Sequence, residues 1–376
     1  MNRQRMFAPV AVALLLAVAG VGSWPAASRA LDVLRARGEG RVVIYGTAEE
    51  SKGEPLVAAF HKLHPQIDAQ YQRRDSAGTY RQFTADIEAG KPVADIVWNS
   101  SMSAQVKLIN DGYSRPYVVS AKDMLPSWAT WKDEGYGITS EALVFAFNVH
   151  APLAAEMPGS HRELLALLER KPELLRGRIG LIDPRLNEIA FMGYSQDLIA
   201  SSDSARLYRA IAASGPQVFD NNRQLIDALQ AGRIDLAFNL LGSYPLNEPS
   251  PDVRVVLPAD YVLMTSRIAF ISRQAPHPAA ARLFLDFLLS HEAQRIIADE
   301  HLGAVRADVD DRTYAGTQAR PIKVGPALLA DFDQMRRRRL LSDWEQAAAE
   351  GLQGDKRPAD SGVSRNGSGA EVNSGT

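Results

Sequence analysis

Short apolar segments alternate with amphipathic ones in the first quarter of the chain, and this alternation constrains the fold more than any other feature. Segments 41–45, 67–71 and 94–98 have the length and composition of short strands. Between them, 55–60 and 79–89 place apolar residues at the spacing of one helix face. Strands and helices that alternate with short connections favour a parallel sheet covered by helices. We therefore expect an α/β fold.

A second α/β set follows later in the chain. Residues 160–169 have a helical pattern, and 178–182 and 236–239 have the composition of buried strands. Two segments rich in β-forming residues, 136–148 and 261–272, flank this set. We interpret them as crossings between two α/β lobes.

The first thirty residues are typical of an export signal. Arg3 and Arg5 precede an apolar run at about 6–22, and small residues then offer a cleavage site after Ala27 or Ala30. A membrane anchor is the alternative, but about 17 residues is short for a bilayer span, which needs about 20. We therefore expect a cleaved signal peptide at 1–30 and a periplasmic protein.

Composition excludes several classes of protein. The 376 residues contain no cysteine, which excludes disulfides and thiolate metal sites, and the net charge of −2 gives no reason to expect nucleic-acid binding. We find no pairing of nucleophile and base and no metal-binding motif, so we expect neither an enzyme nor a cofactor. Residues 354–376 are almost free of apolar side chains and are expected to be a disordered tail.

Four segments carry a resemblance to a known family. They are 42–50 (VVIYGTAEE), 55–65 (PLVAAFHKLHP), 91–98 (KPVADIVW) and 281–294 (ARLFLDFLLSHEAQ). In this order they resemble the solute-binding proteins of bacterial ABC importers. The nearest group is the ferric-iron and phosphorylated-compound receptors, including the phosphoglycerate-transport regulatory type. The chain departs from that group at His64, where an aromatic residue is usual, and at His291, where a proline often stands.

The resemblance implies a type II periplasmic binding protein fold, with two α/β lobes joined by hinge strands around a ligand cleft. The first lobe would comprise 31–137, the second 138–260, and 261–350 would return to the first lobe and end in the terminal helices. Such a protein is expected to be a monomer that closes its lobes on a small solute. It then delivers the solute to an ABC permease in the inner membrane.

Ligands of parallel sheets bind beyond the carboxyl ends of the strands, near helix N-termini, and this rule nominates loop residues. They are Thr47, Glu49, Ser76, Gly78, Thr79, Asn99, Ser100 and Ser101 in the first lobe, and Asp183, Tyr194, Ser195, Asn221, Asn222, Ser243 and Tyr244 in the second. Plain helix caps are the alternative for 76–79 and 99–101, and a β-turn is the alternative for 242–244.

Hydroxyl, amide and backbone N–H donors suit the oxygens of a phosphate, phosphonate or carboxylate. A small anionic solute, preferably a phosphorylated or phosphonate compound, is therefore the expected ligand. Four arginines near these loops are candidates for a charge-assisted contact. They are Arg73, Arg74, Arg185 and Arg223.

Two further functions stay open. Ferric receptors of this group usually show adjacent tyrosines, because phenolate oxygen is a hard ligand for a hard ion. Here Tyr244 stands alone, and Tyr194 is a possible second donor distant in sequence. The other alternative is a sensor, whose closed form docks on a sensor kinase and regulates transport genes.

Overall fold

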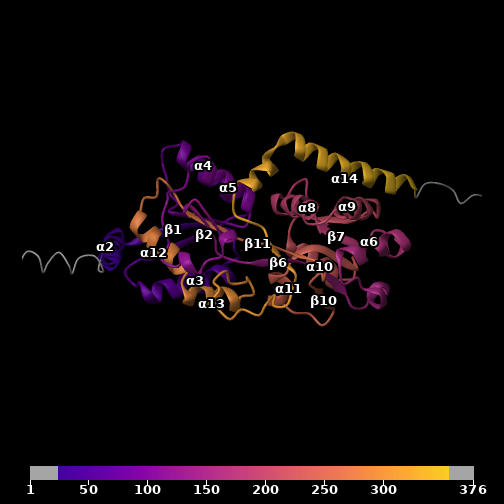
Figure 1. The fold of residues 1–376 in the computed structure, drawn as a ribbon, viewed down its shortest axis with the longest axis horizontal. Helices are drawn as coiled ribbons and strands as arrows, with labels where there is room; N and C mark the ends of the chain where they lie inside the picture. Colours follow the sequence, from indigo (N-terminus) through magenta and orange to yellow (C-terminus); the bar gives the residue numbers. More distant parts are fainter. Residues whose placement is uncertain (1–23, 355–376) are drawn as a thin grey trace, which may run out of the picture.

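The computed structural model describes residues 24–354, which form two lobes side by side (Figure 1). Each lobe is built on one mixed sheet, with six strands in the first and seven in the second. The α/β class and the two-lobe architecture expected from the sequence are confirmed. The expected cleavage positions, Ala27 and Ala30, fall inside helix α2 (Trp24–Glu39). The rest of the expected signal and the expected tail lie outside the described residues.

The first sheet has the strand order β2-β1-β3-β12-β5-β4. Its strands are β1 (Arg41–Gly46), β2 (Asp68–Arg73), β3 (Ile96–Asn99), β4 (Thr130–Trp131), β5 (Gly135–Gly137) and β12 (Ile268–Ile271). Strand β1 pairs in parallel with both β2 and β3, as the strand–helix alternation predicts. The carboxyl ends of these three strands therefore meet at one edge of the sheet.

Helices cover both faces of the first sheet. They are α2, α3 (Glu50–Leu63), α4 (Ser76–Glu88), α5 (Met102–Asn110), α12 (Pro278–Leu288) and α13 (His291–Asp299), with 3-10 turns η1 (Lys122–Met124) and η2 (Ser127–Ala129). Successive strand residues alternate between the two faces. Ile44 and Trp98 pack with α3 and α12, whereas Tyr45 and Val97 pack with α4 and α5. Burial on both faces explains why β1 and β3 are almost continuously apolar.

The second sheet has the order β13-β11-β6-β9-β7-β8, with β10 paired to β6. Its strands are β6 (Glu141–Asn148), β7 (Ile179–Ile182), β8 (Gln217–Phe219), β9 (Leu236–Leu241), β10 (Val253–Val256), β11 (Val262–Thr265) and β13 (Ala319–Pro321). Its helices are η3 (Pro152–Glu156), α6 (His161–Arg170), α7 (Pro172–Leu175), α8 (Glu188–Ala200), α9 (Ser204–Ala213), α10 (Asn222–Gln230) and α11 (Ser243–Asn247). As in the first lobe, parallel strands β9, β7 and β8 lead into helices that begin at one edge.

Two short crossings join the sheets, and both lie within the β-rich segments 136–148 and 261–272. The chain passes from β5 to β6 through 138–140 and returns from β11 to β12 through 266–267. The crossings are bonded to each other, because Ile138 donates its N–H to the carbonyl of Arg267 at 2.9 Å. Strand β11 pairs with β6, so the second sheet extends past the boundary expected at 260.

The terminal helices do not all lie on the first lobe, to which 261–350 was expected to return. A 3-10 segment, η4 (Pro326–Phe332), packs on α5 of the first lobe, and α14 (Gln334–Gly354) then runs over the second lobe onto α9 (Figure 1). The break falls at Asp333, whose carboxylate accepts the N–H groups of Met335 and Arg336 and so starts a new helix. Trp344 enters the second-lobe core, which holds α14 there. Among the described residues, no helix is long and apolar enough to cross a membrane.

Candidate functional site

Three hydroxyl groups meet at the carboxyl edge of the first sheet. Ser100 lies 3.0 Å from Ser76 and 3.2 Å from Thr47, measured between side-chain oxygens, and the Ser100 N–H donates to Thr47 at 3.0 Å. We call Thr47, Ser76 and Ser100 the hydroxyl cluster. All three are half-buried, so they keep access to solvent. They come from the ends of β1 and β3 and the start of α4, as the carboxyl-end rule predicts.

The buried Asn99 amide holds the hydroxyl cluster in place. Its nitrogen donates to the carbonyl of Ser76 at 3.0 Å, and its oxygen accepts the N–H of Ser101 at 2.9 Å. Gly78 gives its N–H to the carboxylate of Asp75 at 2.6 Å, so Asp75 caps α4 and this N–H group is occupied. Asn99 therefore positions Ser76 and Ser101, and Gly78 belongs to the capped first turn of α4.

Two other first-lobe candidates occupy different positions. Thr79 is fully buried beneath α4, and its hydroxyl has no hydrogen-bond partner. Glu49 lies half-buried at the N-cap position of α3, where its side chain makes no capping bond. Burial raises the pKa of Tyr244 in the second lobe, and the negative charge of Glu49 adds to this rise. Thr79 does not contact solvent.

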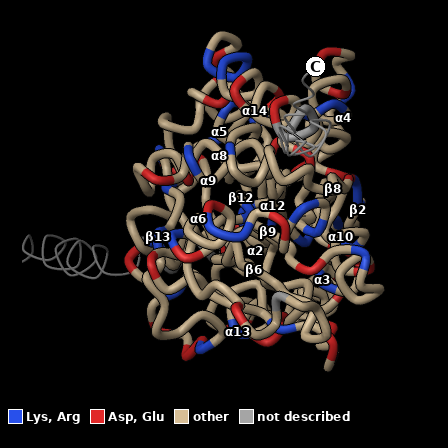
Figure 2. The backbone as a smooth tube through the Cα atoms, turned by 90° about the vertical axis from the view of Figure 1, so that its right-hand side faces the viewer, with Lys and Arg blue, Asp and Glu red and all other residues tan. Residues whose placement is uncertain are grey.

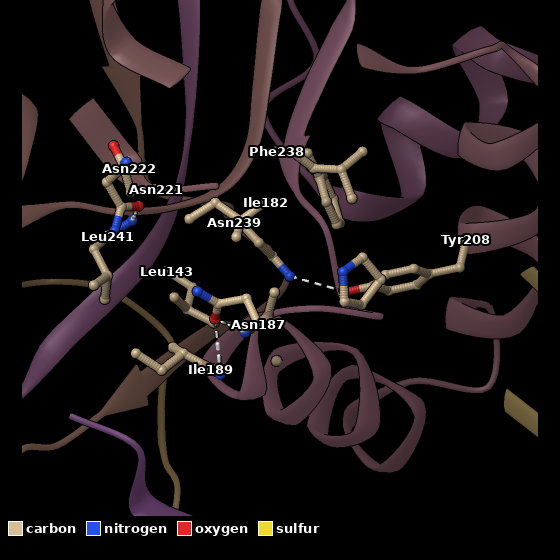
Figure 3. Close-up of a pocket in the computed structure, with 14 residues that line it drawn as sticks. Leu143, Ile182, Asn187, Ile189, Tyr208, Asn221, Asn222, Phe238, Asn239 and Leu241 are labelled. Carbon is tan, nitrogen blue, oxygen red and sulfur yellow. Dashed lines mark hydrogen bonds between the residues drawn. The ribbon is translucent and has the colours of Figure 1, made fainter. Parts of the chain in front are cut away.

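The second lobe contains a cavity of about 90 Å³ where β7 and β9 end and α8 and α10 begin (Figure 3). Most of its wall is aliphatic or aromatic. Its polar lining consists mainly of four asparagine side chains, and none of its lining residues is charged. The asparagines are Asn187, Asn221, Asn222 and Asn239.

Three of these amides are oriented by backbone N–H groups. The Asn187 oxygen accepts from Ile189 and Ala190 at 2.9 and 3.1 Å, which caps α8. The Asn221 oxygen caps α10 at 3.0 Å, and the Asn222 oxygen accepts from the β9 backbone at 3.3 Å. Because the oxygens are occupied, the NH2 groups are the parts of these side chains left to donate to a ligand.

In Asn239, unlike the other three asparagines, the side-chain nitrogen is occupied and the oxygen is left for a ligand. Its NH2 group donates to Asp197 at 2.7 Å and to Tyr208 at 3.0 Å, which leaves its oxygen as an acceptor (Figure 3). Its φ of 52° is in the left-handed region, which a strand residue rarely adopts. The register between β6 and β9 shifts beside it, between Val144 and Ala146. A β-bulge therefore turns this side chain toward the cavity.

Charged residues at the crossings form the base of the region between the lobes. The buried Arg267 makes two contacts with Glu141, at 2.8 and 3.2 Å, and Ser243 donates to the same carboxylate at 2.9 Å. Burial raises the pKa of Tyr244, against the opposing charge of Arg267. Burial likewise raises the pKa of Tyr71 to about 12, and Arg267 again opposes it. Phenols from both lobes therefore lie within the field of one guanidinium.

The lobes also touch directly at the start of α8. Ser101 donates to the carboxylate of Glu188 at 2.7 Å. Ser195, expected in the cleft, instead donates to Asp331 of η4 at 2.8 Å and is fully buried. Its placement in the cleft is therefore wrong, because this side of α8 faces η4.

The expectation for Tyr194 is wrong for a similar reason. Its ring stacks on Tyr208 at 4.1 Å within the second-lobe core, where Trp344 of α14 also packs. Tyr244 packs in other clusters, beside Leu241 and Tyr261. The structure does not bring the two phenols together. Within residues 24–354, no group of three or more His, Asp or Glu side chains is arranged to hold a metal ion.

Asp183 is almost fully buried, and its carboxylate is committed to Arg185 at 2.7 Å. Burial opposes ionisation, but the hydrogen bonds from Arg185 outweigh it and lower the pKa of Asp183. Asp183 and Arg185 thus neutralise each other.

Two of the other three arginines have local partners. Arg74 lies 4.3 Å above the Tyr45 ring, and Arg223 pairs with Glu248, whereas Arg73 is exposed. Figure 2 shows acidic and basic residues interspersed over the molecule. No large surface field of one sign is evident in this view.

Sequence reasoning did not single out Asn187 or Asn239. Asn187 directly precedes α8, which begins at Glu188. Asn239 ends the strand expected at 236–239, although β9 continues to Leu241. An N-cap residue followed by Glu was the available signal for Asn187. No sequence signal marks the bulge at Asn239.

Residues 43–302 match the family model of bacterial extracellular solute-binding proteins. No curated protein matched this sequence significantly. The substrate-binding protein of an ABC transporter from Agrobacterium tumefaciens is 30% identical, with a TM-score of 0.73, and the match covers 82% of this chain and 94% of that one.

More distant structures share the fold. AfuA from Actinobacillus pleuropneumoniae, with fructose-6-phosphate bound, is 18% identical over 82% of this chain and 99% of its own, with a TM-score of 0.67. Iron-bound HitA from Pseudomonas aeruginosa is 21% identical with the same coverage and a TM-score of 0.61. The family match covers more than half of the chain, which therefore belongs to the bacterial extracellular solute-binding proteins.

Proposed function

We propose that this protein is the solute-binding component of an ABC importer and that it captures a small anionic solute, with a phosphate or phosphonate group favoured. The solute lies between the lobes, and hinge closure presents it to a permease in the inner membrane. The hydroxyl cluster is the observation that carries this proposal. Ser76 and Ser100 stand at the N-termini of α4 and α5, where the helix dipole stabilises anionic oxygens, and Thr47 lies beside Ser100.

The direct surroundings of the hydroxyl cluster favour an oxyanion. Ser100 contacts both Ser76 and Thr47, and each hydroxyl can turn its proton toward an incoming oxygen. Arg73, exposed just before α4, adds positive charge nearby. Hydroxyl donors with a guanidinium suit a phosphate better than a neutral group, since hydrogen bonds to charged oxygens are about twice as strong.

A ferric ligand is the weaker candidate. Hard trivalent iron requires several hard anionic donors close together. Tyr194 of α8 is committed to the second-lobe core and cannot join Tyr244 in a pair of phenolate ligands. The acidic groups near Tyr244 are Glu49 and Glu141, and Glu141 is already paired with Arg267. The structures of iron-bound HitA and of AfuA with fructose-6-phosphate support the fold of this chain. The ligand of this chain is therefore inferred from the local contacts.

The place of action follows from the family and the expected export signal. A cleaved signal at 1–30 would release a periplasmic monomer, free to diffuse to its permease. A closed form that docks on a sensor kinase instead would use the same cleft. The neighbouring genes distinguish the two, since a permease and an ATPase indicate transport and a kinase and response regulator indicate sensing.

The test is isothermal titration calorimetry with a panel of glycerol 3-phosphate, 3-phosphoglycerate, fructose-6-phosphate, 2-aminoethylphosphonate, inorganic phosphate and ferric citrate. We expect a phosphorylated compound to bind, and Ser76→Ala or Ser100→Ala to weaken it about 10-fold each, since a hydrogen bond to a charged group contributes about 1.5–3 kcal/mol. Ser127→Ala is the control, because Ser127 is an exposed serine outside the cleft. Binding of ferric citrate alone would contradict the proposal.

A further inference from the structure

We infer that the second-lobe cavity receives an uncharged, hydroxyl-bearing carbon portion of the solute, and that Asn239 selects it. This inference rests on the proposed function, because the anionic head is assigned to the hydroxyl cluster. It narrows the solute from any small anion to a phosphate or phosphonate ester or acid with a short hydroxylated tail. Bare ions are then poor ligands.

The size and chemistry of the cavity support an uncharged carbon group. A water needs about 10–15 Å³ of such volume, so about 90 Å³ accommodates a group of a few heavy atoms. The wall includes Leu143, Ile182, Phe238 and Leu241, which favour carbon over water. No lining side chain carries a charge, so an ion placed here would lose its hydration without a counter-charge.

The cavity amides offer a ligand hydroxyl both hydrogen-bond donors and an acceptor. Asn187 and Asn222 use their oxygens on backbone N–H groups and keep their NH2 donors. Asn239 uses its NH2 on Asp197 and Tyr208 and keeps its oxygen as an acceptor. A ligand hydroxyl both donates and accepts, so it can satisfy an amide of each kind.

Buried hydrogen bonds fix the conformation of Asn239. Its backbone lies in the left-handed region, and such a conformation persists where the surroundings fix it. Here the fixing group is Asp197, a fully buried carboxylate that also accepts hydrogen bonds from Tyr208 and Tyr261, at 2.7 and 2.9 Å. These hydrogen bonds to the Asn239 nitrogen therefore fix the position of its oxygen before a ligand binds.

The cavity lies beside a contact with the other lobe. Helix α8 forms one wall through Asn187, Ile189 and Gly193, and its first residue, Glu188, contacts Ser101 of the first lobe at 2.7 Å. Ser101 directly follows Ser100 of the hydroxyl cluster. A solute whose head lies on the cluster therefore has its tail directed toward the start of α8 and the cavity.

The inference is tested by comparing glycerol 3-phosphate with inorganic phosphate in calorimetric titrations of the whole protein. We expect glycerol 3-phosphate to bind at least 10-fold more tightly, and Asn239→Gly to reduce this ratio to about one. Glycine adopts the left-handed conformation without strain, so the backbone is kept. Lys132→Gly is the matched control, since Lys132 has a φ of 57° and lies in the first lobe.

A second variant fills the cavity without touching the buried carboxylate. A methyl group at Gly193 would lie 3.3 Å from the Leu143 side chain and 3.8 Å from the Asn239 nitrogen. Gly193→Ala also favours the helix, so the variant is expected to fold. We expect it to lower the affinity ratio of glycerol 3-phosphate to inorganic phosphate about 10-fold.

Equal binding of the two compounds by the unaltered protein would overturn the inference, as would unchanged ratios in both variants. If Ser76→Ala still weakens glycerol 3-phosphate in that case, the proposed function stands and the tail assignment alone fails. If no phosphorylated compound binds the unaltered protein, the proposed function fails and the inference with it.

Discussion

The carboxylate of Asp260 shows how one residue joins two elements. It accepts the backbone N–H groups of His161 and Arg162 at 3.2 Å and the ring nitrogen of His161 at 2.9 Å. The His161 ring in turn stacks flat on Tyr261 at 4.1 Å. This side chain therefore fixes the start of α6 to the loop before β11, away from the cleft.

A pH dependence of stability follows from this contact. Burial opposes ionisation of Asp260, but the hydrogen bond and charge of His161 outweigh it and lower its pKa from 3.8 to about 2. The contribution to stability is therefore complete above pH 3.8 and is lost as the pH falls toward 2. Urea unfolding across this range should show a shallower loss of stability in Asp260→Asn than in the unaltered protein. Parallel profiles would contradict the assignment.

At the scale of elements, η4 and α14 add a connection between the lobes besides the two crossings. Asp331 of η4 accepts from Ser103 of α5 at 2.7 Å and from Ser195 of α8 at 2.8 Å. Arg336 of α14 pairs with the same carboxylate at 3.2 Å. One buried carboxylate thus holds a first-lobe helix, a second-lobe helix and the terminal helix together.

Replacement of Asp331 should be costly. Asp331→Ala leaves two buried hydroxyls and the Arg336 guanidinium without their acceptor, and we expect it to lower the free energy of unfolding by about 2–4 kcal/mol. Asp310→Ala is the control, because Asp310 is 79% exposed and pairs with an exposed arginine. Denaturant unfolding measures both. A loss as small as that of the control, within about 0.5 kcal/mol, would mean that Asp331 does not tie the lobes.

The elements also show where sequence reasoning succeeds and fails. Thr47, Ser76 and Ser100 could be grouped in advance, because parallel strands place their carboxyl ends together. Tyr194 and Ser195 could not be placed, since α8 is apolar nearly all round and its pattern does not show which face meets the cleft. Asn239 depends on a bulge that arises from the pairing of β6 with β9, which the local sequence does not specify.

At the scale of the whole molecule, the arrangement allows one lobe to rotate on the other. The crossings are short, and the buried pair of Arg267 and Glu141 lies between them. The direct lobe contacts include polar pairs, such as Ser101 with Glu188 and Asn247 with the carbonyl of Glu300, beside the apolar packing of Met192 of α8 in the first-lobe core. Polar contacts of this kind re-form easily, so a solute can shift the balance between open and closed forms.

The most direct measurement is the distance between spin labels on the two lobes. The chain has no cysteine, so Arg81→Cys on α4 and Gln230→Cys on α10 give two exposed and specific attachment sites. The compound that binds most tightly in the titration panel should shorten the mean distance by several ångströms, the usual consequence of hinge closure. Labels on Arg81→Cys and Glu88→Cys, both on α4, provide the control. Tight binding with no change in the distance between the lobes would contradict capture of the solute between them.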